Sequence, residues 1–182
     1  MGCLLTRGFT LACGKPAGGL KEIYFANWAD IEGELTFDNT GKVSNFPADT
    51  TLFKYQLDQQ SASFSCTQTY SKENQSSFWT HTVTFKRRGI SQAVIAELYN
   101  MTQGKIVAIV RDENDDFFVL GYERGLDVTG GGGFQSGTAL GDMNGSDWVL
   151  VSDEKNPLVQ CAEYDEDPFD FATNVPTINT GA

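Results

Sequence analysis

The chain has 182 residues, enough for one domain with a complete hydrophobic core. It contains 13 Phe, 6 Tyr and 3 Trp, and these aromatics with frequent Thr and Ser favour β-structure over a helical bundle. A net charge of −11 disfavours specific nucleic-acid binding, because an acidic protein repels phosphates. No segment approaches the ~20 apolar residues of a membrane span, so we expect no membrane partner.

The four cysteines, Cys3, Cys13, Cys66 and Cys161, are too widely spaced for a Cys-x-x-Cys metal or redox motif. The single histidine makes a zinc site improbable as well. A reduced cytosolic protein is the simplest interpretation. A secreted protein with two disulfides is the alternative, and no signal peptide supports it.

The first part of the chain predicts a leader followed by strands. Residues 1–19 have little periodicity and suggest an arm or a first edge element. Residues 20–28 predict a strand after a Gly-Gly turn signal, and residues 31–38 a second strand. Residues 43–51 contain a proline and predict a loop.

Three strands with alternating polarity are expected next, over residues 52–58, 61–70 and 78–87. Alternation of this kind is typical of antiparallel sheets with one buried and one solvated face. In the third strand one face is expected to carry Trp79, His81, Val83 and Phe85, and the other Thr80, Thr82, Thr84 and Lys86.

One helix is predicted near residues 91–103. Ser91 can cap its first turn, and Gly104 is expected to end it in a left-handed conformation. Apolar residues recur at three- and four-residue intervals, which indicates one buried face. These residues are Val94, Ile95, Leu98 and Met101.

Residues 105–111 and 117–122 predict a hairpin joined by the polar turn at 112–116. The run Gly130 to Gly133 predicts a flexible loop. Asn144-Gly145 is a strong hairpin signal, expected to join short strands at residues 138–140 and 146–152.

The predicted fold class is therefore all-β, a mainly antiparallel sandwich or barrel with one flanking α-helix. We divide the chain into a β domain over residues 1–152 and an acidic, proline-containing C-terminal extension over residues 153–182. The extension holds seven acidic side chains and one lysine. We interpret it as an extended tail that packs, if at all, on neighbouring molecules or on its own surface.

No residue is assigned a catalytic, cofactor-binding or metal-binding role. His81 is the only side chain that could serve as a near-neutral base, and a hydrogen-bonded core or interface histidine is favoured instead. No Ser-His-Asp or Cys-His spacing accompanies it. The glycine run lacks the spacing of a phosphate-binding loop. We therefore predict that the protein is not an enzyme and needs no cofactor.

Two acidic patterns have ordinary explanations. Asp112, Asn114, Asp116 and Glu123 match part of a calcium loop, but Phe117 stands where that loop needs glycine. A solvated hairpin turn is therefore favoured over a calcium site. Asp165 and Asp167 are read as part of a solvated charge run, with a recognition segment as the alternative.

Two stretches resemble a known family. The sequence GGLKEIYFAN at residues 18–27 is similar to its opening, and DVT at residues 127–129 with GTALGDMNG at residues 137–145 is similar to its close. The family is that of tail tube (major tail) proteins of tailed bacteriophages, of the kind found in phages of Bacteroidetes-type hosts. The resemblance runs from about Gly2 to Ser152 and leaves the role of the acidic extension open.

The resemblance implies a virion structural protein, made in the cytoplasm of the host bacterium and located in the tail. Six copies would form a ring, and stacked rings would form a channel through which DNA passes transiently and non-specifically during genome ejection. The implied partners are further copies of the chain and other phage tail or connector proteins. Deletion after Ser152 is expected to leave the fold intact and to impair assembly.

Two alternatives remain. One is a head–tail connector or ring protein of the virion built on the same fold. The other is of a different class, a β-sandwich carbohydrate-binding module that uses exposed Trp28, Trp79 or Trp148.

Overall fold

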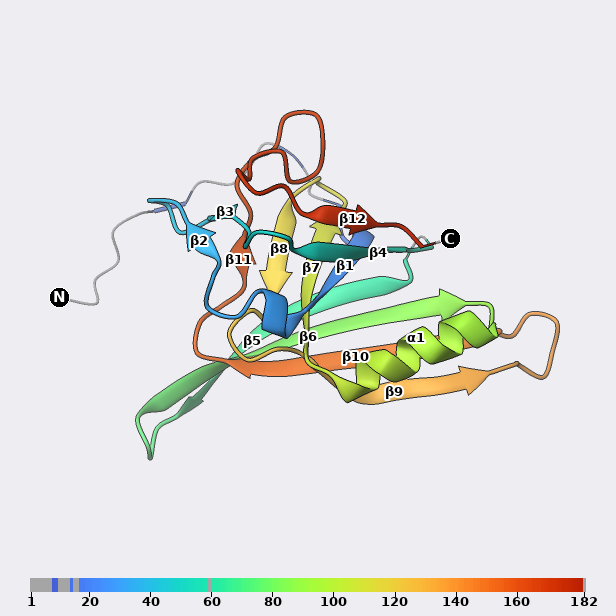
Figure 1. The fold of residues 1–182 in the computed structure, drawn as a ribbon. Coiled ribbons are helices and arrows are strands. Elements are labelled where there is room, and N and C mark those ends of the chain that lie inside the picture. The colour runs from blue at the N-terminus through green and yellow to red at the C-terminus, as the bar shows by residue number, and fades with distance from the viewer. Residues whose placement is uncertain (1–7, 10–13, 15–16, 59, 182) are drawn as a thin grey trace.

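The computed structural model describes residues 8–9, 14, 17–58 and 60–181, and two main β-sheets with one α-helix dominate it (Figure 1). The prediction of an all-β fold with one flanking helix is confirmed. The expected leader falls largely outside the described residues. The larger sheet has the order β11 (Val159–Gln160), β8 (Phe117–Leu120), β7 (Ile106–Asp112), β1 (Leu20–Asn27), β4 (Thr51–Gln56) and β12 (Thr177–Asn179).

The second sheet has the order β5 (Ala62–Ser71), β6 (Ser76–Arg88), β10 (Gly145–Glu154) and β9 (Asp127–Gln135). Both sheets are antiparallel except at β12, which runs parallel to β4. A small hairpin of β2 (Thr36–Phe37) and β3 (Val43–Asn45) stands apart. The predicted strand at residues 31–38 is therefore mostly irregular, and the 3-10 helix η1 (Trp28–Asp30) precedes it. The predicted loop at residues 43–51 contains the strand β3.

The predicted alternation in β6 is confirmed. His81, Val83 and Phe85 are buried, whereas Lys86 on the opposite face is exposed. The β5–β6 hairpin is longer than the sheet it packs on, and its far end projects from the body in Figure 1. Tyr70, near the end of this hairpin, is exposed.

The helix α1 (Gln92–Gln103) closes one end of the space between the sheets, where Leu98 and Met101 join the inner core. The Ser91 hydroxyl accepts a hydrogen bond from the Val94 N–H at 3.4 Å, as an N-cap should. Gly104 does not adopt the predicted left-handed conformation. Its φ of −121° and ψ of 172° are extended, because the chain continues directly into β7.

The six-stranded sheet is buried on both faces. Its second face forms an outer core around Tyr24, Val107 and Ile109, and residues of the C-terminal extension cover it. Phe169 is fully buried there and meets the ring of Tyr24 edge-on, with 5.2 Å between the ring centroids. Of the two expected packings of residues 153–182, on neighbouring molecules or on the chain's own surface, the structure shows the second. The expectation of an extended tail is wrong, because the segment belongs to the core. The segment supplies β11, β12 and part of the core because a second apolar face must be covered.

The run Gly130 to Gly133 does not form the predicted flexible loop. It lies within β9, and a nine-residue connection at 136–144 replaces the predicted two-residue turn at Asn144-Gly145. Gly131 has a φ of +67° at a bulge, where an added Cβ would lie 2.4 Å from the Asp147 carbonyl oxygen. Gly145 opens β10, where a Cβ would lie 2.1 Å from the Arg87 carbonyl oxygen. Close backbone approach, rather than flexibility, requires these glycines.

We predict that Phe169→Ala lowers the free energy of unfolding by about 3–5 kcal/mol, because it leaves a cavity against Tyr24 and Phe46. Val175→Ala is the control, because Val175 is 60% exposed, and we expect it to change stability by no more than about 0.5 kcal/mol. Urea unfolding of both variants measures this. Equal stability of the two variants would contradict a structural role for the extension.

Candidate functional site

A group of buried polar side chains lies where β6 and β10 meet the turn after β8. His81 is fully buried, and its Nδ1 accepts a hydrogen bond from the Gly121 N–H at 3.2 Å. An accepting Nδ1 requires the neutral ring with its proton on Nε2. Burial also lowers the pKa of His81, which favours the same form. The structure confirms the predicted hydrogen-bonded core histidine. Nδ1 carries the only ring lone pair that can accept a hydrogen bond, and the Gly121 N–H already occupies it.

Glu154 lies beside this histidine and is 1% exposed. Its carboxylate accepts hydrogen bonds from the Ser152 hydroxyl at 2.5 Å and from the Glu123 and Arg124 N–H groups at 3.2 Å each. Burial raises the pKa of Glu154, and the nearby Glu123 carboxylate adds to the effect. Ser152 donates to Glu154 and not to His81, so these residue types do not form a nucleophile–base pair.

The Glu123 carboxylate, in the turn after β8, binds the residues that follow β10. It accepts hydrogen bonds from the Lys155 N–H at 2.8 Å and from the Asn156 side-chain amide at 2.7 Å. Burial opposes ionisation, but these hydrogen bonds outweigh it and lower the pKa of Glu123. The turn and the end of β10 therefore satisfy each other's backbone groups, which fastens one sheet to the other.

A second charged cluster surrounds Glu22 on β1. Its carboxylate contacts Lys54 Nζ at 2.5 Å and Arg111 Nη1 at 3.5 Å, and it accepts a hydrogen bond from the Tyr24 hydroxyl at 2.7 Å. Burial raises the pKa of Glu22, but the hydrogen bonds from Lys54 and Tyr24 outweigh it, so the pKa is lowered overall. Arg111 Nη2 also lies 2.7 Å from Asp115. The cluster joins β1, β4 and β7, and its Lys54 side chain also lines a cleft beside α1.

The calcium-like acidic residues do not converge on a common point. Asp112 accepts hydrogen bonds from the Asn114 and Asp116 N–H groups at 2.8 and 2.9 Å, which shapes the predicted hairpin turn. The Asp116 carboxylate accepts instead from Gln160 at 2.7 Å, and Glu123 lies in the turn described above. Within the described residues, no three His, Cys, Asp or Glu side chains are grouped to hold a metal ion.

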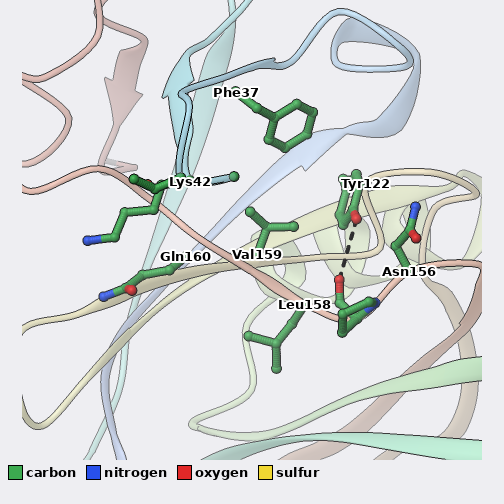
Figure 2. Close-up of a pocket in the computed structure, with 10 residues that line it drawn as sticks. Phe37, Lys42, Tyr122, Asn156, Leu158, Val159 and Gln160 are labelled. Atoms are coloured by element: carbon green, nitrogen blue, oxygen red, sulfur yellow. Dashed lines mark hydrogen bonds between the residues drawn. The ribbon is translucent and has the colours of Figure 1, made fainter. Parts of the chain in front are cut away.

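A shallow depression of about 550 Å³ lies between the β2–β3 hairpin and residues 156–160. Figure 2 shows the residues that line it. Phe37 and Tyr122 face it, and the Tyr122 hydroxyl donates to the Pro157 carbonyl oxygen at 3.4 Å. The polar ends of Lys42 and Gln160 are engaged elsewhere, with Glu163 at 3.5 Å and Asp116 at 2.7 Å. The depression therefore brings no reactive groups together.

The tryptophans do not form an exposed platform. Trp148 is 3% exposed and packs against Phe134, with 6.0 Å between the ring centroids. Trp28 and Trp79 are half-buried. The expectation that Trp148 could bind a carbohydrate from an exposed position is therefore wrong, because the residue belongs to the inner core.

The outer face of the four-stranded sheet consists of exposed and half-buried residues. They alternate along each strand with residues of the buried face, and most of them carry hydroxyl groups. No strand among the described residues pairs with the free edge of β5 or of β9. The residues of this outer face include Ser63, Ser65, Thr67, Thr80, Thr82, Thr84, Val149, Val151 and Asp153.

Comparisons of the chain with protein-family models, with curated proteins and with solved structures found no match. No helix in the described part of the chain is long and apolar enough to cross a membrane.

We predict opposite pH dependences for two Glu→Gln variants. The pKa of Glu154 is raised, so its ionisation destabilises the folded state as the pH rises above 4.5, the ordinary value. The pKa of Glu22 is lowered, so its stabilisation is present above 4.5 and is lost as the pH falls. Relative to the unsubstituted protein, Glu154→Gln should therefore gain stability with rising pH, whereas Glu22→Gln should lose it.

Urea unfolding between about pH 3 and about pH 7 measures both differences. The two variants control for each other, because each removes one carboxylate and adds one amide. Slopes of the same sign would contradict the assigned pKa directions.

Proposed function

We propose that the protein is a virion structural protein, a tail tube subunit whose copies assemble into hexameric rings, and that stacked rings conduct DNA. The single observation that carries the proposal is the four-stranded sheet with two free edges and an uncovered face. Unpaired edges of long strands pair readily with other strands. Joining β5 of one copy to β9 of the next would continue the sheet around a closed ring and remove both edges.

The chemistry of the uncovered face supports a channel wall. Serine and threonine hydroxyls dominate it, and two of them are already hydrogen-bonded within the face, Ser63 to Thr84 at 2.7 Å. Thr80 also donates to Asp153 at 2.7 Å. The face also carries Lys86, opposite Asp147, so its charges are few and mixed. A surface made mainly of hydroxyl groups does not attract phosphates strongly, so DNA would pass without being trapped.

The projecting end of the β5–β6 hairpin supports assembly independently. Tyr70 and Phe78 near its tip are 62% and 40% exposed. Isolated two-stranded ribbons are only marginally stable in water, so contact with a neighbouring copy would stabilise this one. Other tail or connector proteins of the virion are the remaining partners that such a surface suits.

The proposal predicts rings and tubes in electron micrographs of the purified protein, with a matching high mass in light scattering. Rings that never stack would favour a head–tail connector. A strict monomer at high concentration would rule out both functions.

A substitution in β5 tests whether this edge strand lies at the interface between copies. We expect Thr67→Lys, on the outer face of β5, to reduce assembly because a lysine at an edge strand opposes pairing. Asn100→Lys, at an exposed position of α1, is the matched control and should assemble like the unsubstituted protein. Equal assembly of the two variants would show that β5 is not at the interface.

A further inference from the structure

A cleft of about 680 Å³ lies between the ends of β4 and β6, the first turns of α1 and the C-terminal residues 179–181. Four basic side chains line it, Lys54, Lys86, Arg87 and Arg88, together with the acidic Asp58 and Glu97. The whole chain has only 13 basic residues against 24 acidic ones, so this concentration of positive charge is unusual for the protein.

The cations of the cleft differ in whether they are already paired. Arg88 Nε lies 2.9 Å from Asp58, and Lys54 is bound to Glu22. Within the described residues, Lys86 and Arg87 have no ion-pair partner, and both are exposed. They are consecutive residues of β6, so their side chains leave the strand on opposite faces, and Arg87 Nη1 donates to the Arg88 carbonyl oxygen at 2.8 Å. Neither cation is neutralised by a carboxylate, so an anionic partner at this end of β6 would gain charge-assisted contacts.

An acidic surface lies elsewhere on the same chain. Asp165, Glu166 and Asp167 are all exposed, in the loop between β11 and β12. The Asp170 carboxylate accepts hydrogen bonds from the N–H groups of all three, at 3.1, 3.0 and 3.3 Å. Phe169 anchors the loop in the outer core, so the three carboxylates are held in place.

The two surfaces cannot meet within one molecule. Leu98 and Met101 of α1 belong to the inner core, which lies on one face of the six-stranded sheet, whereas Phe169 belongs to the outer core on the opposite face. Figure 1 shows the loop between β11 and β12 rising away from α1. A contact between them must therefore join two copies through different surfaces, which is the head-to-tail arrangement that builds rings or filaments.

We propose that the cleft at Lys86 and Arg87 receives the acidic turn, residues 165–167, of a second copy of this chain. The inference rests on the proposed function, because it assigns one contact of the assembly. Exposed charges are screened over about 10 Å at 0.1 M salt and about 3 Å at 1 M salt, so this contact should weaken as salt is added.

Charge reversal and charge exchange test the contact. We expect Lys86→Glu with Arg87→Glu to raise the protein concentration needed for half-assembly by about tenfold or more. Asp165→Lys with Asp167→Lys should do the same, and combining the four changes should restore assembly. Sedimentation velocity at low and high salt measures assembly, and thermal unfolding confirms that each variant is folded.

Two control pairs change the net charge equally at other exposed sites, Arg124→Glu with Lys155→Glu and Glu32→Lys with Glu34→Lys. Both should assemble normally. Normal assembly of the cleft variant, or failure of the exchanged variant to assemble, would overturn this contact while leaving the tail tube proposal intact. A monomeric unsubstituted protein would overturn both.

A phosphate ligand is the competing occupant. It is probed by fluorescence anisotropy with a short DNA duplex and the unsubstituted protein. Binding that is lost in Lys86→Glu with Arg87→Glu, without loss of assembly, would assign the cleft to phosphates and overturn the proposal. No binding, with assembly lost, supports a second copy.

Discussion

The six-stranded sheet is apolar on both faces, and the rest of the molecule follows from the need to cover them. In β1, Ile23 and Phe25 face one side and Tyr24 and Ala26 the other, and all four are buried. The four-stranded sheet and α1 cover the first side, and the β2–β3 hairpin with residues of the C-terminal extension covers the second. A sheet buried on both faces loses stability if either cover is removed.

The four-stranded sheet differs from the six-stranded sheet, because only one of its two faces packs on a core. Its outer face stays polar, and its edges stay open. The buried contacts of His81 and Glu154 with the turn after β8 fasten it to the larger sheet. The hydrogen bonds of His81 Nδ1 and of Glu154 to the turn offset part of the cost of burying these groups and fix how the two sheets meet, whereas His81 Nε2 has no partner among the described residues. Open sheet edges are what the proposed assembly requires.

Much of the fold and little of the site could be predicted from the sequence. The period of two in β6 and the three- and four-residue spacing of Leu98 and Met101 reflect burial on one face, so they are visible locally. The role of His81 as a core residue was also predicted. Glu154 was missed as a buried residue, because it looked like one more charge in an acidic run and its partners are thirty residues away.

The sequence by itself determined the all-β class, the single helix and its inward face, and the absence of any recognisable catalytic motif. Only the tertiary structure decided that Gly131 belongs to a strand, that Trp148 is buried, and that Phe169 closes the outer core. The physical reason is the same for all three. Each depends on contact with a segment distant in the chain, whereas the periodicity of a strand or helix depends only on near neighbours.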